Sequence, residues 1–195
     1  MRIEIIPYYT PITEKPYCCV PAVLQMIQQR RGFDFASQDE IGYQLGLIVP
    51  PEMQSLFTKL HTGHEPKAGW GTQTAKEEFS IDKYFQRNGL PFRLRIQGVE
   101  NLEELRNILA ESIYRGDDII ICYNSKLLFG DGDIEHVSLI QDLDTSTGDI
   151  MVVDPARGAP KHRKSNVKNL FEVLKSHYVS DRGRLWIVSA LDNIR

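Results

Sequence analysis

The chain has 195 residues, of which 42% are hydrophobic and 25% charged, and its formal net charge is −3. This composition is typical of a folded globular protein, and the length favours one domain. A slightly acidic chain without a long basic run is poorly suited to nucleic acid or an anionic membrane, so we expect neither as a partner. Nothing in the sequence specifies an oligomeric state.

Two features bear on where the protein resides. The first nine residues lack the basic-then-apolar order of a secretory signal, and no apolar run approaches the ~20 residues of a membrane-spanning helix. The three cysteines, two of them adjacent, do not form a disulfide framework. We therefore expect a cytoplasmic protein.

The first part of the chain is mainly helical in pattern. Residues 2–6 indicate an edge strand, and a proline-containing segment leads to a helix over residues 19–31. That helix is apolar on nearly every side, which is typical of a buried helix, and Gly32 follows it. Further helices are predicted over residues 37–45, 74–88 and 101–114, with a loop over 61–72 and a strand over 92–96.

The last third changes to short segments rich in β-branched residues. Strands are predicted over residues 119–123, 136–143, 150–153 and 185–190, with a helix over 165–177 that His177 would end. The basic cluster 161–164 is interpreted as a solvated loop. Helices followed by antiparallel strands indicate an α+β fold. We expect one domain over residues 1–195, with a mainly helical lobe (about 1–115), a mainly antiparallel β lobe (about 116–195) and a cleft between them.

Cys19 is the candidate nucleophile. A thiol attacks as its thiolate, and the N-terminus of a helix favours that form through its partial positive charge. Cys19 stands at the start of the predicted helix, where its backbone N–H could also serve as an oxyanion donor. The alternative is that Cys19 is a small buried apolar residue. Cys18 and Cys122 are interpreted as structural.

His136 is the candidate base, with Asp154 as the residue that orients it. His136 opens a strand directly after a glycine-containing stretch, so its ring can face a cleft. Asp154 ends the next strand, which returns toward His136 in an antiparallel hairpin. A simple register places His136 opposite Arg157, and a longer turn or a bulge would bring Asp154 closer. The alternative is that Asp154 begins an Asp-Pro turn.

The other histidines do not indicate a metal site. His61 and His64 have a metal-like spacing, but only Glu65 offers a further ligand nearby, so a surface loop is the simpler interpretation. We therefore expect no metal and no organic cofactor.

Three segments together resemble a known family. Residues 19–22, Cys-Val-Pro-Ala, are similar to the Cys-Gly-Pro-Ala that begins the nucleophile helix of the papain-like peptidases that process bacteriocin leader peptides. Residues 136–140 and 152–155 are similar to the His strand and the Asp-Pro strand of that family. Phytochelatin synthases, which are distant relatives, have a similar layout.

The resemblance implies a papain-like fold and a Cys19–His136–Asp154 triad that acts on a peptide or small amide through a thioester. Two positions depart from the family. Thr13 stands where the family has a glutamine that lines the oxyanion hole, so its hydroxyl is the candidate donor, and Val20 replaces a glycine. We expect no fused transporter.

Three functions remain open. The first is a cysteine peptidase or peptide-amide acyltransferase. The second is a catalytically degenerate papain-like module that binds a peptide or partner, which the missing glutamine favours. The third is a phytochelatin synthase-like transpeptidase. In the loop over residues 61–73, Trp70 and Thr72 are candidates for a cleft wall, although Trp70 could equally pack in the core.

Overall fold

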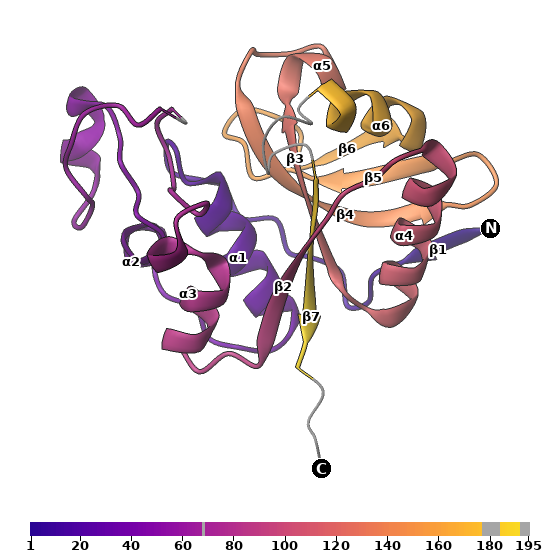
Figure 1. Ribbon diagram of the computed structural model, residues 1–195, viewed down its shortest axis with the longest axis horizontal. Helices are drawn as coiled ribbons and strands as arrows, with labels where there is room; N and C mark the ends of the chain where they lie inside the picture. The colour runs from indigo at the N-terminus through magenta and orange to yellow at the C-terminus, as the bar shows by residue number, and fades with distance from the viewer. Residues whose placement is uncertain (68, 177–183, 192–195) are drawn as a thin grey trace.

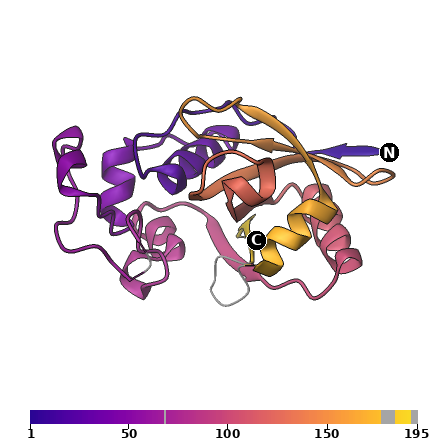
Figure 2. The same ribbon diagram turned by 90° about the horizontal axis from the view of Figure 1, so that it is seen from above.

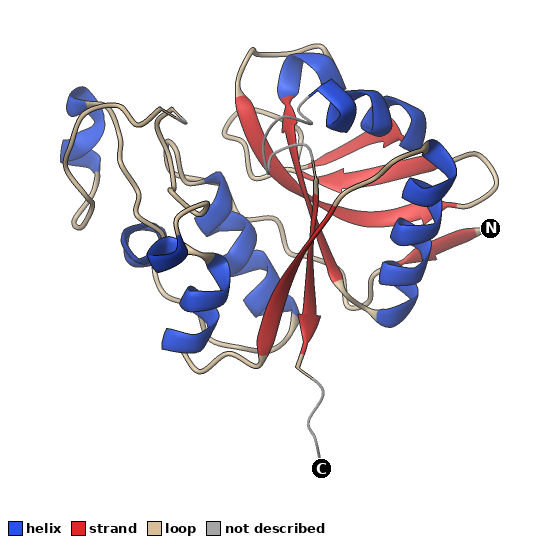
Figure 3. Cartoon of the chain, viewed as in Figure 1, coloured by secondary structure: helices blue, strands red, loops and turns tan. Residues whose placement is uncertain are grey.

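One antiparallel sheet organises the chain, of which the computed structural model describes residues 1–67, 69–176 and 184–191. Its strands are β1 (Arg2–Glu4), β2 (Phe92–Gln97), β3 (Asp118–Asn124), β4 (Glu135–Asp144), β5 (Asp149–Val153), β6 (His162–Asn166) and β7 (Leu185–Ala190). They are hydrogen-bonded in the order β2-β7-β3-β4-β5-β6, and β1 pairs with the end of β4. Helices and an antiparallel sheet make up the chain together, so the α+β class predicted from the sequence is confirmed (Figure 3).

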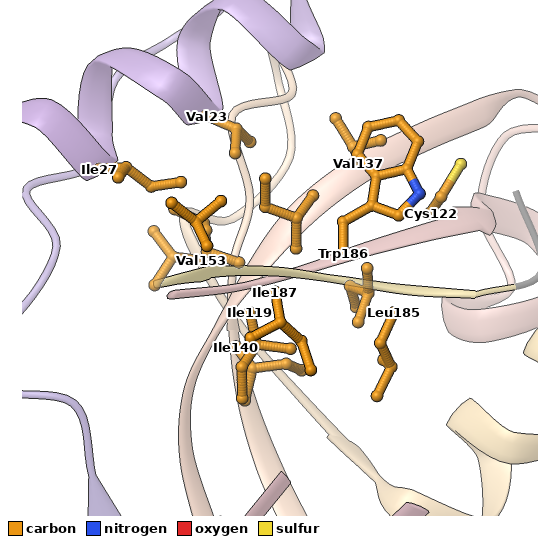
Figure 4. Packing of buried hydrophobic residues seen from close by; sticks show 14 of the residues in the cluster. Val23, Ile27, Ile119, Cys122, Val137, Ile140, Val153, Leu185, Trp186 and Ile187 are labelled. Atoms are coloured by element: carbon orange, nitrogen blue, oxygen red, sulfur yellow. The ribbon is translucent and has the colours of Figure 1, made fainter. Parts of the chain in front are cut away.

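Helices pack on both sides of this sheet (Figures 1 and 2). They are α1 (Cys19–Arg30), α2 (Gln38–Gln44), α3 (Ile81–Arg87), α4 (Leu102–Arg115), α5 (Ser125–Phe129) and α6 (Val167–Ser176). Helix α1 packs against β4, whereas α4 and α6 pack against each other and against β3. In Figure 4, Val23 and Ile27 of α1 lie on one side of the sheet, and Ile140 and Ile187 point to the other. Within the described ranges, no helix is long and apolar enough to cross a bilayer.

Side-chain caps determine where several helices begin. Helix α1 begins at Cys19, as predicted, but without a side-chain cap. Helix α4 follows Asn101, whose side chain accepts a hydrogen bond from the Glu104 N–H at 2.9 Å. Ser37 caps α2 in the same way through the N–H of Glu40. These caps satisfy amides that have no partner within the helix. The starts of these helices are therefore predictable from local sequence.

The helix predicted over residues 74–88 is wrong in its first half. The chain forms a 3-10 turn at Glu77–Phe79, and α3 begins only after Ser80, which caps the Lys83 N–H at 3.3 Å. A serine side chain competes with helical backbone hydrogen bonds and favours an N-cap over a helix interior. The apolar spacing of this segment therefore spans two elements.

The interpretation of the basic segment 161–164 as a solvated loop is wrong, because most of it lies in β6. Strand β6 pairs along its length with β5 and has no strand on its other side in the described sheet. An edge strand pairs through its backbone on one side only, and polar or charged side chains suit it because they discourage pairing with a further strand. The short helix α5, capped by Asn124, was not predicted. The predicted helix over residues 165–177 is α6, and His177 lies outside the described residues.

The predicted lobes do not divide the sheet between them. Strand β2 precedes residue 115 in the chain, yet it pairs with β7 over its whole length. Helix α4 also packs on β3 and β4 rather than with the other early helices. The sheet therefore contains strands from both halves of the sequence.

A buried carboxylate, Asp118, joins the sheet to α1. It receives hydrogen bonds from Arg30 Nε at 2.7 Å, Arg31 Nε at 2.6 Å and the Tyr9 hydroxyl at 2.7 Å. The side chains of Asp118 and Arg30 are almost completely buried, so this charge is paired where water cannot solvate it. The three partners come from the end of α1 and from the segment that precedes it. Asp118 therefore fixes α1 against β3.

Asp118→Asn should lower the free energy of unfolding by about 3 kcal/mol or more, because Arg30 and Arg31 lose their buried counterion. Urea unfolding monitored by far-ultraviolet circular dichroism measures this change. The control is Glu111→Gln, which removes an exposed partner of Arg115 at 3.6 Å and should change the same quantity by less than about 0.5 kcal/mol. A loss below about 1 kcal/mol for Asp118→Asn would contradict the role assigned to this residue.

Candidate active site

Cys19 is the first residue of α1 and is only partly exposed, whereas its neighbour Cys18 is completely buried. The chain turns sharply before the helix, with Tyr17 at φ +62° and the Cys18 N–H bonded to the Lys15 carbonyl at 2.9 Å. Helix α1 is anchored by a run of buried residues that begins at Val20. This packing therefore fixes the position of Cys19 at the N-terminal end of the helix, where the partial positive charge of the helix lies.

His136 binds Asp154 through one ring nitrogen, Nε2. The distance from His136 Nε2 to Asp154 Oδ1 is 2.7 Å, and both side chains are buried. An ionised carboxylate only accepts, so Nε2 carries the proton and Nδ1 is left for other partners. Asp154 thus has the geometry of a group that orients the ring.

A β-bulge determines the face on which Asp154 lies. Strands β4 and β5 change register by one residue at Gln141, so that Leu139 pairs with Val153. Without this shift Leu139 would pair with Asp154, and Asp154 would lie on the opposite face of the sheet from His136. The bulge therefore places the carboxylate on the face of the imidazole.

The bulge is bound to the lead-in segment, which we define as residues 5–17. The Gln141 carbonyl accepts from the Ile5 N–H at 2.9 Å, and its side chain donates to the Ile5 carbonyl at 2.7 Å. The same side chain accepts from the Tyr9 N–H at 3.1 Å. Polar groups that a bulge leaves outside the ladder are thereby satisfied, which stabilises the shifted register.

Arg163 of β6 also holds Asp154. Its Nη1 donates to Asp154 Oδ2 at 3.1 Å, its Nη2 donates to both carboxylate oxygens of Asp131 at 2.8 Å, and its guanidinium lies 3.7 Å from the centre of the Phe129 ring. Burial opposes ionisation of Asp154, but hydrogen bonds from His136, the Ala156 N–H and Arg163 hold its pKa below the ordinary value. Sequence reasoning missed Arg163 because it assigned the residue to a solvated loop.

Glu14, Cys19 and His136 come together at one point. One ligand-type atom of each, a carboxylate oxygen, Sγ and a ring nitrogen, all lie within 4.8 Å of one another. Burial lowers the pKa of His136, but hydrogen bonds to Asp154 and Cys19 and the nearby negative charges outweigh it and raise this pKa to about 10. The geometry therefore favours an imidazolium next to the thiol at neutral pH.

Glu14, and not the predicted Thr13, lies next to Cys19 and His136. The Thr13 side chain is exposed, and only its backbone carbonyl has a role here, accepting from Gln38 Nε2 at 3.0 Å. Gln38 also accepts from the Lys15 N–H at 2.7 Å, so it holds the backbone on both sides of Glu14. Burial raises the pKa of the Glu14 carboxyl. The one signal for Glu14 in the sequence is its position five residues before Cys19, next to the position expected to carry the oxyanion donor.

A cavity of about 590 Å³ opens next to Cys19 and His136. It lies between the start of α1, the loop around Trp70 and Thr72, and the sheet, so both cleft candidates line it. Its sheet side is apolar, with Leu94, Ile96, Cys122, Val137 and Trp186 among the lining residues. Figure 4 shows the last three of these grouped on one side of the sheet. The thiol and imidazole therefore meet a space large enough for a small ligand or a few residues of a peptide.

Comparison with known proteins assigns no family to the chain, because no protein-family model matches it and no curated protein matches it. The function of the site must therefore be argued from its own geometry.

Iodoacetamide in limiting amount at about pH 6 should label Cys19 at least ~10-fold faster than Cys18 or Cys122. Cys18 is completely buried, and burial raises the pKa of its thiol far above the ordinary range, while Cys122 is also buried. His136→Ala should remove most of the preference, because the thiolate loses its cationic neighbour. Mass spectrometry with fragmentation, needed because Cys18 and Cys19 share a peptide, measures this order. Equal, slow labelling of all three thiols would contradict an activated Cys19.

Proposed function

We propose that this protein is a papain-like cysteine peptidase or peptide-amide acyltransferase. The observation that carries the proposal is the connected set of side chains from Cys19 through His136 to Asp154, which opens on the 590 Å³ cavity. A nucleophile, a base and a residue that orients the base are the parts required for acyl transfer through a thioester. The apolar wall next to them suits an acyl group or a peptide side chain.

In the acylation step, the Cys19 thiolate attacks the carbonyl carbon of a bound amide and forms a tetrahedral adduct. Protonated His136 then gives its proton to the leaving nitrogen, the C–N bond breaks and a thioester remains. Asp154 keeps the imidazole in position and stabilises its cationic form.

In the second step, neutral His136 removes a proton from water or from an acceptor amine, which attacks the thioester carbonyl. The C–S bond breaks, the thiolate of Cys19 is restored and the acid or new amide leaves. Water gives hydrolysis, and an amine gives transfer. The same residues serve both reactions, so the group that reaches the cavity decides the outcome.

This chain differs from the family that it resembles in the groups available to stabilise the oxyanion. Cys19 contributes a first-turn N–H, which has no partner within the helix. Glu14 lies beside Cys19 and His136 and is the candidate for a second donor, but it can donate only when its carboxyl is protonated. This difference favours, as the second candidate function, a module that binds a peptide in the cavity without turnover.

Cys19→Ala and His136→Ala should each lower kcat/KM by about 10³-fold or more, and the double variant should be no worse than either one, because the residues act as a unit. Asp154→Ala should retain measurable activity. The assay is release of a fluorophore from a panel of peptide and γ-glutamyl amides in the presence of a chelator. Turnover that survives Cys19→Ala would refute the assignment of the nucleophile.

Glu14→Gln should raise kcat/KM at neutral pH by about 10-fold or more, because an amide donates at every pH and one oxyanion donor contributes about 10²–10³ in rate. Chelator is kept in the assay so that a change in metal content cannot produce the effect. The matched control, Thr13→Ala, removes an exposed hydroxyl next to Glu14 and should leave the rate within about twofold. A fall in kcat/KM for Glu14→Gln would show that the carboxyl itself is needed and would overturn this role.

A further inference from the structure

The Glu14 carboxylate has no hydrogen-bond donor within the part of the chain that the structure describes. Lys161 is a nearby cation, but its ammonium group donates to the carbonyls of Pro155 and Ala156 at 3.1 and 2.7 Å. The carboxylate instead lies next to the thiol of Cys19 and the ring of His136. Burial raises the pKa of the Glu14 carboxyl and outweighs the charge of His136, which lowers it, so the carboxylate oxygens keep lone pairs that a further cation could bind.

We propose that Glu14, Cys19 and His136 together bind a zinc ion, and that the bound metal blocks the Cys19 thiol. Thiolate, imidazole and carboxylate are the three kinds of side chain that bind Zn²⁺. With zinc–ligand bonds of about 2.0–2.3 Å, the ligand atoms of a tetrahedral site are about 3.5 Å apart. The three atoms are already within 4.8 Å of one another, so small side-chain movements complete the site.

The surroundings of the three ligands also match a zinc site. A histidine that binds a metal usually donates its other N–H to a carboxylate, which is the contact that His136 makes to Asp154 at 2.7 Å. Arg163 in turn holds Asp154 at 3.1 Å, so the ring is fixed through Nε2 and Nδ1 is left for the metal. This support is built in whether or not an acyl substrate is ever bound.

The fourth coordination position faces the cavity, which Cys19 and His136 both line. Three protein ligands and one open position characterise zinc sites that hold water or an exchangeable ligand. Binding Zn²⁺ removes one proton from the Cys19–His136 pair, and the sulfur lone pair that would attack a carbonyl is then used to bind the metal. Occupied and free protein therefore differ in thiol reactivity, and removal of the metal restores it.

Direct binding tests the site without any substrate. Reduced full-length protein stripped with a chelator should bind one Zn²⁺ per chain in isothermal titration calorimetry, and Co²⁺ should give a thiolate-to-cobalt charge-transfer absorption. Glu14→Gln should weaken binding at least ~10-fold, and Cys19→Ala should abolish the charge-transfer absorption. The matched controls are Cys18→Ala, which removes the adjacent thiol outside the cluster, and Glu40→Gln, which removes a carboxylate outside the cluster that pairs with Lys59. Both variants should bind Zn²⁺ as the parent does. Binding that is unchanged in Glu14→Gln and Cys19→Ala would overturn the site.

Thiol protection separates this site from the proposed function. One equivalent of Zn²⁺ should slow iodoacetamide labelling of Cys19 at least ~10-fold, a chelator should reverse the effect, and Glu14→Gln should lose most of the protection. Selective labelling of Cys19 without any protection by zinc would overturn the metal site and leave the peptidase proposal standing. Zinc protection with the expected dependence on Glu14, but without turnover of any amide in the stripped protein, would support the metal site and count against the peptidase.

Discussion

The salt-bridged cluster around Asp118 is the interaction on which the arrangement of the molecule depends. It fixes the C-terminal end of α1 to the start of β3, and Tyr9 ties the lead-in segment to the same carboxylate. Because a helix of 12 residues is about 18 Å long, its orientation at that end determines where Cys19 lies at the other. The cavity then lies between this helix end and the sheet, and the distance from thiol to imidazole is determined by packing far from either group.

Much of the fold can be predicted from local sequence. The starts of α1, α2 and α4 follow from apolar patterning and from capping side chains, and the strands rich in β-branched residues occur near their expected positions. Two kinds of element escape this reasoning. Strand β6 is polar because it lies at an edge, and α3 is shorter than its apolar spacing indicates because Ser80 offers a competing hydrogen bond. In both cases tertiary context or a single side chain outweighs the pattern.

The candidate site was predictable in its residue types but not in its geometry. Patterning indicated Cys19, His136 and Asp154 individually, but the register that puts His136 and Asp154 on one face depends on contacts from Gln141 to residues more than 130 positions earlier. No local signal encodes such a contact. Glu14 escaped notice for the same reason, since its closeness to the thiol arises from Gln38 and Pro155, which hold its backbone. The spacing found in the family that the sequence resembles pointed instead to the neighbouring Thr13.

The long-range contacts of the bulge at Gln141 can form only late in biosynthesis. Cys19 leaves the ribosome more than 110 residues before His136, and the contacts of Ile5 and the Tyr9 N–H with Gln141 cannot form until β4 has been made. Contacts of such sequence separation form late, since a long loop must close before they are gained. The nascent chain therefore carries a thiol at residue 19 that has no imidazole beside it. Cys19, His136 and Asp154 come together only after the β4–β5 hairpin, which bears His136 and Asp154, has joined the sheet. A chain that stops short of that hairpin therefore carries the Cys19 thiol without the imidazole and the carboxylate that accompany it in the folded protein.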